Sequence, residues 1–286
     1  MKFAIAHSLR LAAATPVWEH HCELRLAPGP TDHQTVSGVS VTVEPRAEVR
    51  SYRDGFGNTV HAFDLNAPHS EARVVLRAAV ETTLDNPFAF SPIAPSAERG
   101  WIAEALHLQP RLWDYLLFHS PAAPPLAGLE VAVPKRDPAK PLLEALQDVV
   151  QWAADAFSLA EPGEHPAPAG LAEALRTEVV DARSLAHLLL SVARAWGAPA
   201  RYVHGHRDPG YDDGEAPTLH AWAEVLVPGA GWRGLDPCAG LVTNHTYVSI
   251  ATGRDAGDCP PIRSTCKGDE ATPAADDAVI EVRCDQ

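Results

Sequence analysis

Three segments between residues 184 and 237 decide the fold, and they read SLAHLLLSVARAWGAPARYV (184–203), LHAWAEV (219–225) and GWRGLDP (231–237). The first segment is dominated by apolar residues and predicts a helix from Asp181 to Trp196. Asp181 is typical of a helix N-cap, and Gly197 and Pro199 are typical of the residues that follow a helix end. The apolar run contains polar side chains and is too short to cross a bilayer, so we expect a helix of a globular core.

Strands follow this helix in the sequence. The pattern predicts strands at 200–204, 220–227 and 232–235, and the turn residues at 228–231 predict a hairpin that places His220 and Asp236 on neighbouring strands. An earlier helix is predicted over 142–157, where apolar side chains fall on one helical face. Helices followed by antiparallel strands indicate an α+β domain, which we place at residues 139–286.

The first part of the chain has a different pattern. Alternation with period two at 36–43 and strand-like runs at 59–65 and 71–83 predict an antiparallel β-sandwich-like domain over residues 1–85. Residues 86–138 are punctuated by prolines, and this range is typical of a connector, with one short helical segment at 96–118.

Composition excludes several functional classes. The chain has 23 Lys+Arg and 37 Asp+Glu, a net charge of −14, which argues against nucleic acid and anionic membranes as partners. Five cysteines in 286 residues are an odd number and no disulfide framework, so we expect free thiols in a reducing compartment. The N-terminus lacks the long apolar region of a signal peptide, and the expected location is cytoplasmic. The oligomeric state stays open.

Taken together, the three segments resemble the transglutaminase-like superfamily of cysteine enzymes, in particular bacterial transglutaminase-like proteins related to cysteine proteases. The resemblance extends to the N-terminal β-domain of those proteins through the turn at Asp54–Asn58 and its flanking strands. It therefore covers nearly the whole chain. It implies a papain-like α+β core domain, and it implies acyl transfer or amide hydrolysis on a peptide, a protein side chain or a peptide-like molecule.

A Cys–His–Asp triad carries this chemistry in the family. The resemblance places His220 on the general base and Asp236 on the carboxylate that orients it. The family cysteine lies five residues before the histidine that matches His187, and that position here is Ala182. With a native Cys at 182 the chain would be an acyltransferase or amidohydrolase; as written it is inactive by that mechanism. It is then either an engineered Cys→Ala variant or a natural pseudoenzyme.

Other residues offer rival sites. Cys238 lies two residues after Asp236 and should be on the wrong side of the imidazole to replace the nucleophile. A metal-binding protein could be built on His204, His206 and His220, although we favour histidines that line a cleft without a metal.

Three residues are predicted to contact substrate: Arg183, His204 and Trp222. We expect no cofactor and no metal. The alternative to an enzyme is a module that binds a peptide or protein in the same cleft without catalysis.

Overall fold

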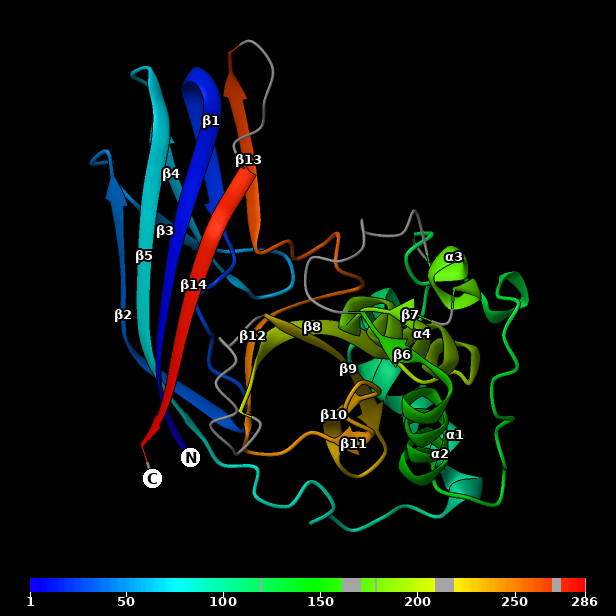
Figure 1. The fold of residues 1–286 in the computed structure, drawn as a ribbon. Coiled ribbons are helices and arrows are strands. Elements are labelled where there is room, and N and C mark those ends of the chain that lie inside the picture. The colour runs from blue at the N-terminus through cyan, green and yellow to red at the C-terminus, as the bar shows by residue number, and fades with distance from the viewer. Residues whose placement is uncertain (119, 161–170, 178, 209–218, 269–273, 286) are drawn as a thin grey trace.

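The computed structural model describes residues 1–118, 120–160, 171–177, 179–208, 219–268 and 274–285, and for the last of these ranges only the backbone. It contains a tall antiparallel sheet and, beside it, a smaller sheet covered by helices (Figure 1). The predicted α+β architecture with an N-terminal antiparallel β-domain is confirmed.

The N-terminal sheet is built around one strand, β1 (Lys2–Leu24), which is 23 residues long. Residues 2–12 of β1 pair with β5 (His69–Thr82) and β14 (Ala274–Asp285). Residues 20–24 pair with β4 (Thr59–Leu65) and β13 (Ile262–Lys267). β2 (Gln34–Glu44) and β3 (Arg50–Arg53) complete the sheet as β2-β5-β1-β4-β3. The sheet therefore curls on itself, and the two halves of β1 share one apolar cluster that includes Leu9, Leu11, Cys22, Leu24 and Phe63.

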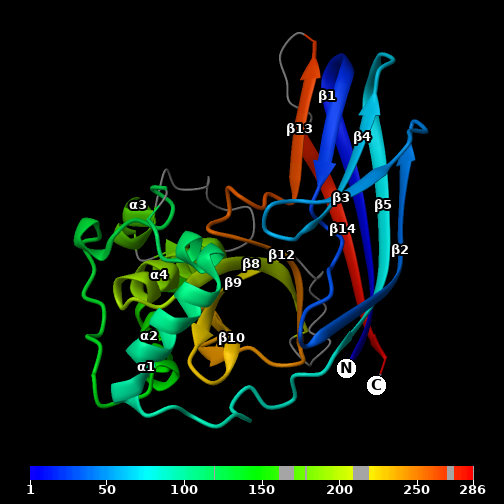
Figure 2. The same cartoon turned by 180° about the vertical axis from the view of Figure 1, so that it is seen from behind.

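The C-terminal strands return to this first sheet. β13 and β14 follow the core domain in the sequence but pair with β1, as both views show (Figure 2). The sequence-based boundaries assign residues 262–285 to the second domain, whereas in the structure these residues belong to the first sheet. Pairing between the two ends of a chain leaves no local signal in the sequence.

Helices occupy the connector and one side of the smaller sheet. The connector contains α1 (Pro95–Leu108) and two 3₁₀ turns, η1 (Pro110–Tyr115) and η2 (Leu126–Gly128). The second domain contains α2 (Leu142–Ala156), α3 (Leu171–Arg176) and α4 (Ala182–Ala195). β6 (Ser158–Leu159) and β7 (Val179–Val180) form a short parallel pair beside them.

Helix α4 ends where the sequence predicts. The Asp181 side chain accepts a hydrogen bond from the Ser184 amide at 2.7 Å, which caps the N-terminus. At the other end Gly197 has φ +79°, and the amide of Ala198 bonds the carbonyl of Ala193 while that of Gly197 bonds Arg194. This pair of bonds is a Schellman motif, which satisfies the last carbonyls of the helix.

The smaller sheet has the order β11-β10-β9-β8-β12. Its strands are β8 (Ala200–Arg207), β9 (His220–Val227), β10 (Gly231–Asp236), β11 (Leu241–Val242) and β12 (Tyr247–Gly253). Helix α4 packs against β8 and β9, and its leucines share one core with Ala221, Ala223 and Val225. This packing fixes the start of α4 relative to the strands that carry His220 and Asp236.

Two buried side-chain amides join the domains. Gln34 bonds both the carbonyl and the amide of Ser249, and Asn58 does the same with Thr252, at distances of 2.8 to 2.9 Å. Each side-chain amide thus makes the two hydrogen bonds to the backbone of β12 that a neighbouring strand would make. β12 is the edge strand of the smaller sheet. An edge strand whose backbone groups are paired in this way is protected from other chains.

Candidate active site

The β9–β10 hairpin brings the two predicted triad residues together. His220 is the first residue of β9 and Asp236 is the last of β10, and the strands pair in the register Leu235 with Ala223. The turn between them contains Gly229 and Gly231, both at positive φ, as a tight connection requires. Nε2 of His220 lies 2.7 Å from Oδ2 of Asp236.

Asp236 is completely buried and fully bonded. Besides His220, its carboxylate accepts hydrogen bonds from the Tyr247 hydroxyl at 2.7 Å and from the amides of Cys238 at 2.9 Å and Ala239 at 3.3 Å. Burial by itself would raise the pKa of Asp236, but the hydrogen bond and charge of His220, with the other donors, hold the pKa below its ordinary value. Asp236 is therefore an ionised carboxylate that fixes one ring nitrogen of His220 and leaves Nδ1 for a reacting group.

Trp222 and Tyr247 support the imidazole from behind. The rings of His220 and Trp222 lie nearly parallel with centroids 6.4 Å apart, and Trp222 meets Tyr247 edge-on at 5.3 Å. Trp222 is buried, so it packs under the pair instead of presenting an open surface to substrate. Tyr247 was not predicted, because it comes from β12, and nothing in its local sequence marks a partner of Asp236.

Residue 182, the predicted nucleophile position, is at the start of α4. Ala182 is the first residue of the helix and is half-buried, and Arg183 beside it is exposed. Asp181 at the N-cap is close enough to the Cys238 thiol to raise its pKa. Since Cys238 follows Asp236 by two residues, the N-terminus of α4 is near the turn that follows β10.

Cys238 is a poor substitute for a thiolate at position 182. Its backbone is tied to the Asp236 carboxylate, so the residue lies on the carboxylate side of the imidazole. Burial, Asp236 and Asp181 all raise the pKa of the thiol far above its ordinary value. A neutral thiol is a weak nucleophile, which agrees with the expectation from the sequence.

The structure separates His204 and His206 from His220. Gly205 pairs directly with His220, and side chains alternate along a strand, so both histidines point to the opposite face of the sheet from His220. Both are buried at the domain junction, where Nε2 of His204 lies 3.0 Å from the carbonyl of Arg25 and Nε2 of His206 lies 2.8 Å from Nε2 of His7. The three imidazoles cannot share one metal, which contradicts the rival metal site, and the burial of His204 gives no support to its predicted contact with substrate.

We expect three buried histidines, His7, His187 and His204, to lower the free energy of unfolding at acid pH. Burial is the largest cause that lowers the pKa of His7, His187 and His204, each to about 4 from 6.5. Between about pH 6.5 and 4 the unfolded chain binds more protons than the folded chain, so the free energy of unfolding decreases by a few kcal/mol as the pH falls through this range. Urea unfolding at a series of pH values measures the slope, and the exposed His107→Gln should leave it unchanged. A flat profile between pH 6.5 and 5 would contradict the assignment.

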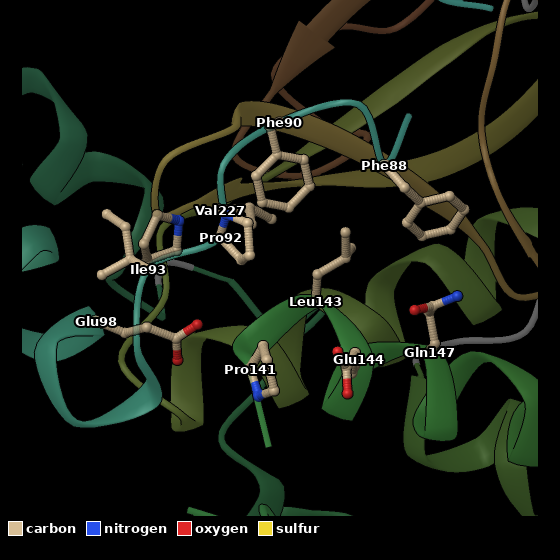
Figure 3. A pocket seen from close by; sticks show the side chains of 11 residues that line it. Phe88, Phe90, Pro92, Ile93, Glu98, Pro141, Leu143, Glu144, Gln147 and Val227 are labelled. Carbon is tan, nitrogen blue, oxygen red and sulfur yellow. The ribbon is translucent and has the colours of Figure 1, made fainter. Parts of the chain in front are cut away.

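A small apolar pocket lies at the other end of β9. Its volume is about 160 Å³, and it lies between the connector, α2 and the β9–β10 turn. In Figure 3, Phe88, Phe90 and Pro92 face Leu143 across the opening, with Glu98 at the left and Gln147 at the right. His220 begins this eight-residue strand and Val227 ends it, so the pocket is roughly 23 Å from the His220–Asp236 pair. It is not part of the candidate active site.

Comparison with known proteins agrees with this geometry. Residues 3–81 match the family described as "Bacterial transglutaminase-like N-terminal region", and residues 130–237 match "Transglutaminase-like superfamily". An uncharacterized protein of Mycobacterium leprae is 30% identical over 294 residues, which cover 98% of each chain. The chain belongs to the transglutaminase-like superfamily.

Further relatives extend this membership. An uncharacterized protein of Mycobacterium tuberculosis is 28% identical over 78% of this transglutaminase-like chain and 74% of its own. The crystal structure of "a Putative Cysteine Protease from Cytophaga hutchinsonii" is 18% identical, covers 99% of this chain and 98% of that one, and has a TM-score of 0.69. The two proteins therefore share both the curled N-terminal sheet and the core domain.

Among the described residues of this transglutaminase-like chain, no helix is long and apolar enough to cross a bilayer.

Proposed function

We propose that this chain is a natural pseudoenzyme of the transglutaminase-like superfamily, which binds a peptide or peptide-like amide at a site that has lost its nucleophile. The observation that carries the proposal is the 2.7 Å contact between His220 and the buried carboxylate of Asp236, beside the helix that begins at Ala182. The general base and its orienting acid are in place, but alanine supplies no atom for covalent attack.

The residue before Ala182 favours a natural origin over an engineered substitution. A thiolate at a helix N-terminus is stabilised by the helix dipole, whereas a carboxylate next to it has the opposite effect. Asp181 occupies this neighbouring position and already raises the pKa of the Cys238 thiol. Asp181 and Ala182 both differ from the residues that an active thiolate site needs. Two adjacent differences fit a gradual loss of activity better than one deliberate substitution. An Ala codon at position 182 in the source genome supports the proposal, and a Cys codon contradicts it.

Restoring the thiol tests whether the site is otherwise assembled. We expect Ala182→Cys to react with an iodoacetamide probe at neutral pH. His220→Ala in the same background should slow labelling at least tenfold. A positioned base contributes about 100-fold or more, and bases in the solvent replace part of that contribution. Asp181→Ser in that background should accelerate labelling, because a serine still caps the helix without a negative charge. Labelling is read by mass spectrometry on the peptide containing residue 182, which separates it from Cys238 and Cys266.

Equal labelling rates with and without His220 would show that the imidazole does not serve position 182. The proposed base would then be wrong even though the fold is correct.

Exposure of Arg183 supports its proposed contact with a carboxylate of the bound peptide. Its guanidinium is accessible at the first turn of α4, next to the position of the missing nucleophile. Arg183→Gln should weaken binding of an acidic peptide more than that of its amidated counterpart, as measured by isothermal titration. Equal weakening of the two would contradict a charge contact.

We also propose a cytoplasmic location. Cys22, Cys238 and Cys259 are free thiols, and Cys238, on the turn after β10, is only half-buried. Free accessible thiols persist in a reducing compartment. Fractionation of cells that produce the full chain checks this proposal.

A further inference from the structure

The carboxylate side of the candidate active site carries a cluster of metal-ligand atoms. One ring nitrogen of His220, one carboxylate oxygen of Asp236 and Sγ of Cys238 all lie within 4.8 Å of one another. We propose that these three side chains bind a divalent transition metal ion, with zinc as the best match. This inference uses His220 and Asp236 but does not depend on the proposed function, because the residue at position 182 contributes no ligand to it.

The chemistry of the three groups selects the metal. Imidazole nitrogen, thiolate sulfur and carboxylate oxygen are the three ligand types that zinc takes in proteins. Magnesium and calcium prefer sites made of oxygen alone, and the thiolate disfavours them. Three protein ligands leave a fourth position of the tetrahedron for water or for a group of a bound molecule.

The backbone holds the three groups before any ion arrives. The amides of Cys238 and Ala239 both donate to Oδ1 of Asp236, so the turn after β10 keeps the thiol beside the carboxylate. The β9–β10 pairing holds His220 on the neighbouring strand. Cys238 is half-buried, and 18% of the His220 side chain is exposed, so an ion can reach the cluster from solvent. An ion bound here replaces the 2.7 Å hydrogen bond between Nε2 of His220 and Oδ2 of Asp236, and the backbone that positions the three side chains keeps the ordering entropy of binding small.

The charges around the cluster favour a cation. The buried carboxylate of Asp236 lies beside the Cys238 thiol, and Asp181 adds a second negative charge near it, which Arg207 offsets only in part. This negative field attracts a divalent ion. Binding forms the metal–sulfur bond, and the proton of the thiol passes to solvent.

The purified full chain, freed of metal with a chelator, provides the test. We expect it to bind one equivalent of Zn²⁺ in competition with a chromophoric chelator, and to give with Co²⁺ a sulfur-to-cobalt charge-transfer band in the near ultraviolet.

Variants assign the ligands. Cys238→Ser should abolish the charge-transfer band and weaken Zn²⁺ binding at least about 100-fold, and His220→Gln should weaken binding to a similar extent while keeping the fold, as judged by circular dichroism. The matched control is Cys266→Ser, because Cys266 is also a half-buried cysteine but lies on β13 in the other domain. An unchanged band in Cys238→Ser, or binding of less than one equivalent of Zn²⁺ by the wild-type chain, would overturn the proposal.

Discussion

Replacing Gly205 with alanine should destabilise the protein by about 3 kcal/mol or more. A Cβ atom at this position would lie 2.0 Å from the backbone carbonyl oxygen of Val248 and 2.7 Å from the indole ring of Trp222. The carbonyl belongs to β12, which is paired with β8 on this side, so it cannot retreat without breaking the sheet. The indole supports His220, so the same substitution should disturb the candidate active site.

Urea unfolding followed by far-ultraviolet circular dichroism measures this loss. The control is Gly100→Ala in α1, where a Cβ would meet nothing within 4 Å. Alanine is the better helix former, so this control should gain about 0.5 to 1 kcal/mol. A Gly205→Ala variant as stable as the wild type would show that β8 and β12 are not as close as the structure places them.

Asp236→Asn should cost about 3 kcal/mol of stability, because it removes the charge from a buried and fully bonded group. The carboxylate accepts four hydrogen bonds, from His220, Tyr247 and two backbone amides. An amide offers one acceptor oxygen, and its NH₂ group would oppose donors that now point at a carboxylate. At least two of these donors would lose their partner around a side chain that is completely buried.

The matched control for this substitution is Asp148→Asn. Asp148 is exposed on α2 and pairs only with Lys140 at the surface, where such a pair contributes little. We expect a change of less than about 1 kcal/mol for the control in the same urea titration. Equal effects of the two substitutions would mean that the bonds around Asp236 do not stabilise the fold.

Short-range patterns predicted the elements that carry the site. The cap of Asp181, the stop at Gly197 and the hairpin between His220 and Asp236 all involve residues close in sequence, or two strands joined by a tight turn. Local hydrogen bonds and backbone conformations decide such features, so residue types reveal them directly. The position of Ala182 at the start of a helix follows for the same reason.

Strand register decides where His204 and His206 lie. Both lie on a strand next to His220, as expected, but the pairing of Gly205 with His220 turns them to the other face. A shift of one residue in register reverses every side chain of a strand, and the sequence of β8 does not specify its pairing with β9. Burial at the junction with His7 and Arg25 then follows from the docking of the first domain.

By itself, the amino-acid sequence determined the helix that begins at Ala182 and the hairpin that carries His220 and Asp236, because local periodicity, turns and caps decide such elements. The transglutaminase-like core followed from the resemblance of three segments to the family, which the family comparison supports. Only the tertiary structure decided that β13 and β14 complete the first sheet, that Tyr247 bonds Asp236, and that Cys238 lies within ligand distance of His220. Such contacts join strands whose pairing depends on long-range burial and register, which no short stretch of sequence encodes.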